Sequence, residues 1–197
     1  MMNSELERKL KDAVFAAHSL FDRGKTSGSS ANISFRHEDT VYISASGTCF
    51  GTLKEEDLVP IDLEGHPLSD RKPSKEWVMH LLLYRKSDQI GAVIHTHSTF
   101  SVLWSFVPGL NESDCIPAHT PYLRMKLGTV GMIPYEKPGS EALFSAFRER
   151  VDFSDGFLLR QHGPIIPGAD MMDAFYRIEE MEESARIAWE LYRAGLA

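Results

Sequence analysis

The sequence predicts a single α/β domain over residues 1–197, built on an antiparallel or mixed sheet. Segments with helical periodicity and short apolar strands alternate throughout the chain. In the first half, tight polar turns separate the strands at a spacing typical of hairpins. No repeat, low-complexity tract or linker divides the 197 residues.

Five segments have the pattern of helices. The first carries Leu6, Leu10, Val14 and Ala17 at helical spacing among charged residues, and it ends before Gly24. The other helices are expected at 76–86, 100–106, 140–150 and 170–194.

The strands are short runs of β-branched and other apolar residues bounded by turns. One is centred on Val93 and Ile94 and ends in the run His95-Thr96-His97. The others are expected at 33–36, 40–44, 58–62, 130–135 and 156–161. We predict a loop over 117–121, and a turn at Gly163-Pro164 after the last strand.

The net charge of −7 comes from 21 basic and 28 acidic side chains, which argues against nucleic acid or an anionic membrane as the main partner. The polar start of the chain has no signal-peptide pattern, and no apolar run has the length of a transmembrane helix. Only two cysteines are present, Cys49 and Cys115, which indicates a reducing compartment. A cytoplasmic location is therefore expected.

Two histidines at the end of a strand form the first candidate site. Because strand side chains alternate between faces, His95 and His97 are expected to point to the same side, close enough to share one ion. The alternative is that they merely line a polar strand end. His162 follows a second apolar strand, and three histidines with an open fourth position are typical of a catalytic metal.

Two small-residue loops are candidates for binding an anion. Backbone N–H groups and hydroxyls in 28–32 and in Ser46-Gly47 could cradle a phosphate, although both loops have the composition of ordinary turns. Ser74 and Lys75 could add a hydroxyl and a cation to the same site. Taken alone, Lys75 has the features of an ordinary solvated lysine.

Glu76 opens a predicted helix just after a proline. It could simply stabilise the helix dipole, or it could lie beside the metal as a ligand, a general base, or both. His80, four residues later, is interpreted as a packed histidine. Tyr122 could place a phenol acid near the metal, or it could pack at the base of its loop.

Five motifs follow one another along nearly the whole chain: Gly28-x-x-x-Asn32-Ile33-Ser34, Ser46-Gly47, Pro73-Ser74-Lys75-Glu76, His95-Thr96-His97-Ser98 and Gln161-His162-Gly163. In this order they resemble the class II aldolase/adducin family. The resemblance implies a three-layer α/β/α sandwich around a largely antiparallel sheet. It also implies a homo-oligomer, commonly a cyclic homotetramer with sites at subunit interfaces.

The resemblance also implies roles for individual residues. His95, His97 and His162 match the ligands of a divalent metal, usually Zn²⁺, one per subunit, with Mn²⁺ or Co²⁺ as alternatives. Glu76 matches the catalytic glutamate, which can also bind the resting metal. The positions that hold the substrate phosphate are matched by Asn32, Ser46, Gly47, Ser74 and Lys75.

Further features resemble the 3-oxo-tetronate 4-phosphate decarboxylase branch of this family. They include the Glu-rich last helix and Tyr122, which matches the proton donor of that branch. The pentulose-phosphate 4-epimerase branch usually carries Asp at the position of Glu76. Two departures from the aldolases are Ala31, where many have Gly, and the absence after Ala197 of the tail that supplies a tyrosine in fuculose-phosphate aldolase.

The implied activity is that of a carbon–carbon lyase. It is the metal-dependent decarboxylation of 3-oxo-tetronate 4-phosphate to dihydroxyacetone phosphate and carbon dioxide through a metal-stabilised enediolate. Glu76 and Tyr122 would move the protons, and which is acid and which is base stays open. The alternatives are a sugar-phosphate aldolase and a non-catalytic, adducin-like assembly module.

Overall fold

The computed structural model describes residues 4–196 and shows a mixed sheet of seven strands in the order β3-β2-β1-β4-β7-β6-β5. Neighbouring strands are antiparallel except β5 and β6, which are parallel. The strands are β1 (Asn32–His37), β2 (Thr40–Ser44), β3 (Leu58–Asp62), β4 (Ala92–His95), β5 (Val130–Ile133), β6 (Gly156–Leu159) and β7 (Gly163–Gly168).

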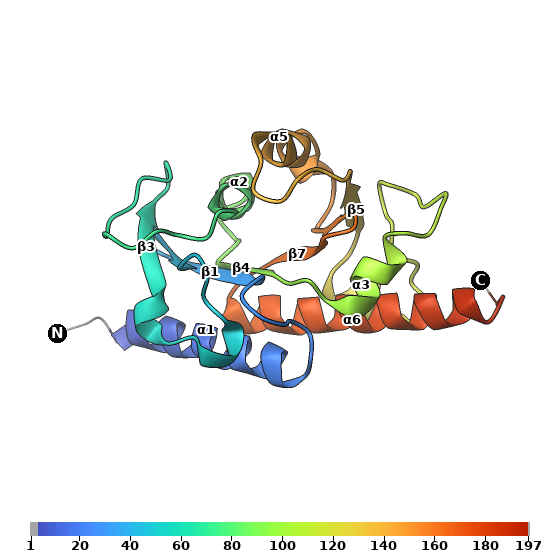
Figure 1. Ribbon diagram of the computed structural model, residues 1–197, viewed down its shortest axis with the longest axis horizontal. Helices are drawn as coiled ribbons and strands as arrows, with labels where there is room; N and C mark the ends of the chain where they lie inside the picture. The colour runs from blue at the N-terminus through green and yellow to red at the C-terminus, as the bar shows by residue number, and fades with distance from the viewer. Residues whose placement is uncertain (1–3, 197) are drawn as a thin grey trace.

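Helices cover both faces of this sheet, so the molecule has three layers (Figure 1). The long helices α1 and α6 lie on one side with α3, and α2 and α5 lie on the other. The α-helices are α1 (Ser4–Asp22), α2 (Trp77–Lys86), α3 (Thr99–Trp104), α4 (Tyr122–Lys126), α5 (Glu141–Arg150) and α6 (Met171–Arg193). Three short 3-10 helices complete the described chain: η1 (Phe50–Thr52), η2 (Glu55–Asp57) and η3 (Val151–Phe153).

The alternation of side chains along the central strands divides the core into two layers. Ile33 and Phe35 of β1 pack with α1 and α6, and so does Ile94 of β4. Val93 faces the opposite way and packs in the layer formed with α2 and α5. The polar residue Asn32, at the start of β1, is paired in register with His95 at the end of β4, so both lie at the same end of these two central strands.

The predicted three-layer α/β class is confirmed, and two local predictions are wrong. The residues from Gly163 onward form β7, a central strand between β4 and β6, and not only a turn. Proline normally argues against a central strand because it lacks an N–H. Here the carbonyl of Pro164 accepts from the backbone N–H of Thr96 at 3.1 Å, so the ladder continues through its acceptor.

The second correction concerns the strand that carries the histidines. β4 ends at His95, and His97 lies in the segment that leads into α3. The helix α4 was also not predicted. Cys49 and Cys115 are both free, and none of the helices described between residues 4 and 196 is long and apolar enough to cross a membrane. Residues 1–3 and 197 of the predicted domain lie outside the described residues.

Candidate metal centre and anion cavity

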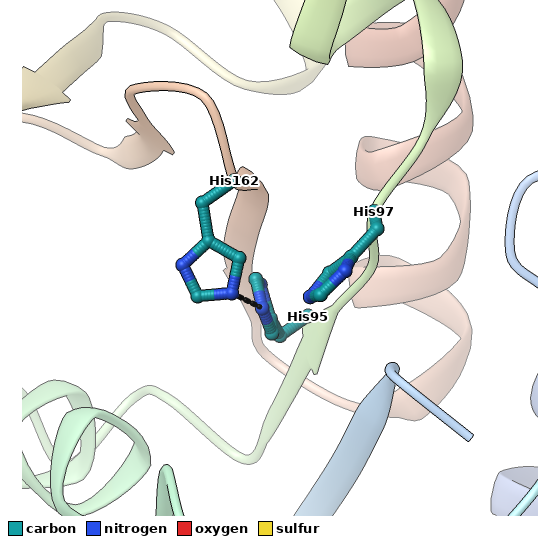
Figure 2. A group of neighbouring side chains, drawn as sticks. All are labelled: His95, His97 and His162. Carbon is teal, nitrogen blue, oxygen red and sulfur yellow. Dashed lines mark hydrogen bonds between the residues drawn. The ribbon is translucent and has the colours of Figure 1, made fainter. Parts of the chain in front are cut away.

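Three histidines from two segments that are far apart in the sequence meet at the ends of neighbouring strands of the sheet (Figure 2). His95 ends β4, His97 follows it, and His162 lies in the turn between β6 and β7. One nitrogen from each ring lies within 4.8 Å of the other two. The prediction that His95 and His97 lie close enough to share one ion agrees with this geometry, although His97 lies just beyond the end of β4.

Hydrogen bonding determines which nitrogen of His95 faces the cluster. Nδ1 lies 2.7 Å from the carbonyl oxygen of Pro164, which can only accept, so Nδ1 carries the proton and donates. The lone pair is then on Nε2, which lies 3.3 Å from Nε2 of His162. Such a backbone partner is typical of a metal-binding histidine, because it orients the ring.

The environment keeps the cluster neutral. Burial, followed by the charge of His97, lowers the pKa of His95 well below its ordinary value. Burial also lowers the pKa of His97, against the opposing effect of Glu76. Burial, with a smaller contribution from His95, lowers the pKa of His162 to about 3. Neutral imidazoles are the form that binds a metal ion.

The cluster fits a divalent metal on a further observation. Nε2 of His97 is buried and has no hydrogen-bond partner among the residues described. A buried ring nitrogen without a partner is costly, and a cation bound by the three rings would satisfy it. Three imidazoles beside a carboxylate are also a donor set suited to zinc and its neighbours in the transition series.

The carboxylate of Glu76 faces this cluster. Glu76 occupies the N-cap position of α2, and its side chain is buried. Its Oε2 lies 3.3 Å from Nε2 of His95, and its Oε1 lies 3.4 Å from Nε2 of His162. Oε2 also accepts a hydrogen bond of 2.9 Å from Nδ2 of Asn32. The position suits both a metal ligand and a group that moves protons beside the metal.

A cavity of about 290 Å³ opens beside the cluster. His97, His162 and Glu76 line one part of it. Its lining also includes all the residues predicted to hold a phosphate, namely Asn32, Ser46, Gly47, Ser74 and Lys75. The start of α2 lies at this cavity, and the N-terminus of a helix favours an anion.

The structure does not bring Tyr122 into this cavity. Tyr122 is the first residue of α4, it is 56% exposed, and it is not part of the lining. Other lining residues were not predicted as site residues. They are Ser29, Ser30, Ala31, Ala45, Pro138 and Gly139. The Ser29-Ser30 pair lies inside the predicted phosphate loop, whereas nothing local in the sequence links Pro138-Gly139 to it.

Gly163 allows the two histidine segments to approach. A Cβ atom at this position would lie 2.1 Å from the carbonyl oxygen of Thr96 and 3.0 Å from Cα of His97, and φ is +147°. We expect Gly163→Ala to push the segments apart, to destabilise the protein by about 1–3 kcal/mol and to weaken metal binding. Thermal unfolding and metal content measure both effects.

Gly109→Ala is the matched control for this prediction. Gly109 also has a positive φ, +74°, but a Cβ atom there would meet nothing within 4 Å. It should lose some stability from backbone strain and keep its metal. A Gly163→Ala protein that binds metal as well as Gly109→Ala would show that the close approach is not needed.

The order and geometry of these residues agree with a known family. The model of the class II aldolase and adducin N-terminal domain matches residues 11–189. The chain belongs to this family. The predicted resemblance is therefore confirmed, and the histidine cluster agrees with the metal dependence of the class II aldolases in this family.

Individual relatives cover most of the chain. It is 37% identical to the 3-oxo-tetronate 4-phosphate decarboxylase of Haemophilus influenzae, with 90% of this chain and 85% of the relative covered. It is 33% identical to the L-fuculose phosphate aldolase of Methanocaldococcus jannaschii, with 90% and 93% covered. The solved structure of YgbL from Escherichia coli matches it with a TM-score of 0.91 at 33% identity, over 95% of this chain and 91% of that one. Decarboxylases and aldolases both break carbon–carbon bonds, in agreement with the predicted lyase.

Proposed function

We propose that this protein decarboxylates a 3-oxo-tetronate 4-phosphate to dihydroxyacetone phosphate and carbon dioxide. One observation carries the proposal: a single cavity joins the residues predicted to hold a phosphate to a three-histidine cluster with a buried carboxylate. A short sugar acid with a phosphate at one end and the breaking bond near the other suits such a cavity. Several relatives that bear the name of this decarboxylase are 32–37% identical to the chain.

The metal in this proposal is Zn²⁺, one per subunit, with Mn²⁺ or Co²⁺ as alternatives. His95, His97 and His162 would hold it, and Glu76 would complete the set in the resting protein. A divalent cation supplies Lewis-acid stabilisation of the negative charge that develops as carbon dioxide leaves.

Side chains would bind the substrate and transfer the proton. Lys75 and the hydroxyl groups of Ser46 and Ser74 would bind the phosphate and orient the substrate. The C1–C2 bond breaks, C1 departs as carbon dioxide, and its electron pair remains on the C2–C3 unit as an enediolate. A proton delivered to C2 then completes dihydroxyacetone phosphate. Glu76 lies where it could carry that proton to or from the reacting atoms.

Tyr122 is the second proton carrier that we propose, and its position bears on the assembly. It is exposed and outside the cavity of its own chain, so it can act only at the cavity of another copy. This role for Tyr122 would require a homo-oligomer with sites at subunit interfaces, and we propose a homotetramer. A single catalytic domain over residues 1–197 and a cytoplasmic location complete the proposal.

The test is the release of carbon dioxide from the D and L forms of 3-oxo-tetronate 4-phosphate, by metal-loaded and chelated protein in parallel. Metal-dependent release together with dihydroxyacetone phosphate from one form is expected. No release from either form would reject the decarboxylase.

A sugar-phosphate aldolase is the second candidate, because relatives named L-fuculose phosphate aldolase are 30–33% identical to the chain. It predicts condensation of dihydroxyacetone phosphate with an aldehyde. The third candidate is an adducin-like assembly module without activity. It predicts that chelation changes neither oligomer nor stability, and the retention of all three histidines argues against it.

Lys75→Ala tests the phosphate end of the cavity. We expect KM to rise about three- to tenfold with little change in kcat, because the exposed lysine attracts the phosphate equally in the ground and transition states. Steady-state kinetics measure the split. Lys72→Ala is the control, since Lys72 is a nearby exposed lysine outside the lining. An effect confined to kcat would contradict this role of Lys75.

A further inference from the structure

A line of hydrogen bonds runs from the cavity into the protein between β1 and α2. Nδ2 of Asn32 lies 2.9 Å from Oε2 of Glu76, and Oδ1 of Asn32 lies 2.6 Å from Nε2 of His80. Nδ1 of His80 lies 2.7 Å from the hydroxyl of Ser34, which lies 2.7 Å from the hydroxyl of Tyr84. All five side chains are buried, with 0–6% of each residue exposed.

Regular secondary structure brings these side chains into one row. Asn32 and Ser34 are two residues apart on a strand, so both point to the α2 side of the sheet. Glu76, His80 and Tyr84 recur every four residues along the start and body of α2, so they share one helix face. Two residues of strand rise about 6.6 Å and four residues of helix rise about 6 Å. The spacing of the side chains on β1 therefore matches the spacing of those on α2.

Only one arrangement of protons satisfies the whole row. A carboxylate can only accept, so the amide group of Asn32 must direct its NH₂ to Glu76 and its oxygen to His80. Nε2 of His80 must then carry a proton and donate it. Burial lowers the pKa of His80 to about 3, so the ring is neutral and its Nδ1 accepts.

Ser34 and Tyr84, at the end of the row farthest from the cavity, maintain the Nε2–H tautomer of His80. Because Nδ1 of His80 accepts, the hydroxyl of Ser34 must donate to it and accept in turn from Tyr84. Burial raises the pKa of Tyr84, which keeps its proton. The opposite orientation of the Asn32 amide would set its oxygen against the carboxylate and its NH₂ against the N–H of His80.

We propose that His80 is a positioning residue for the reaction. As the Nε2–H tautomer, which Ser34 and Tyr84 maintain, it holds the amide of Asn32 with its N–H groups toward Glu76 and the cavity. Asn32 lines the cavity and binds Glu76 Oε2, so its orientation sets both the carboxylate and one wall of the anion site. The effect on turnover rests on the function proposed above, whereas the tautomer and the amide orientation do not.

The kinetic test compares two substitutions of His80. His80→Phe fills the space but removes the donor, and His80→Gln keeps an N–H near the position of Nε2. We expect His80→Phe to lower kcat about 10- to 100-fold with unchanged metal content, and His80→Gln to recover most of the loss. Equal losses in both variants, in step with a lower Tm, would indicate a purely structural role and overturn the proposal.

A second readout needs no substrate. In ¹⁵N NMR spectra of the zinc-loaded protein, we expect His80 to be the neutral Nε2–H tautomer throughout about pH 6–8, with its signals assigned by their loss in His80→Gln. The side-chain NH₂ signals of Asn32 should shift in His80→Phe and return toward their native positions in His80→Gln. An Nδ1–H tautomer, or unchanged Asn32 signals in His80→Phe, would overturn the proposal.

The two readouts separate this proposal from the function on which it partly rests. A native protein that releases no carbon dioxide but shows the expected tautomer and Asn32 shifts would reject the decarboxylase and support the positioning role. A native protein that is active, with His80→Phe equally active, would reject the positioning role alone.

Discussion

Replacing His97 with alanine is expected to abolish metal binding and to lower kcat/KM by about a thousandfold or more. Nε2 of His97 has no hydrogen-bond partner among the described residues, so its removal leaves no other group unpaired and the fold should survive. Lewis-acid stabilisation by a metal contributes several kcal/mol, and each ~1.4 kcal/mol corresponds to a tenfold change in rate. Metal analysis and decarboxylation kinetics on the same preparation measure both effects.

His66→Ala is the control for that experiment. His66 is exposed, pairs with Asp62, and belongs neither to the cluster nor to the lining of the cavity, so both metal content and turnover should stay native. Chelation of the native protein should reproduce the loss of activity and lower Tm, because a metal that binds only the folded state stabilises it. A His97→Ala protein with a full complement of metal would show that His97 is not a ligand.

Replacing Glu76 with glutamine is expected to lower kcat about 10²- to 10⁴-fold, the usual contribution of a group that transfers a proton in the transition state. Metal content should fall far less than in His97→Ala, because the three histidines remain. The fold should also survive, since glutamine has the same shape and its carbonyl oxygen can accept the hydrogen bond from Asn32. Kinetics, metal analysis and circular dichroism test the three expectations.

The control here is Glu64→Gln, at an exposed glutamate in the turn after β3. It removes the same charge and should leave kcat unchanged. Native turnover in Glu76→Gln would remove Glu76 from the proton transfers and leave it, at most, as a ligand of the resting metal.

Local sequence patterns predicted most of the elements because their causes are local. The spacing of Leu6, Leu10 and Val14 reflects one buried face of α1, and the expected first helix agrees with the structure. β7 was missed because its cause is not local. Pro164 and Pro167 argue locally against a central strand, and only pairing with β4 and β6 makes one.

The sequence by itself determined the family and the three-layer class, and it predicted the three histidines, Glu76 and the phosphate-loop residues of the candidate site, because those residues lie in short motifs in a specific order. Tertiary structure decided which of them share a cavity. It joined the phosphate-loop residues to the histidine cluster, left Tyr122 on the surface, and linked His80 to Asn32. The physical reason is that these contacts join side chains far apart in the chain. They depend on strand register and helix placement, which no local pattern specifies.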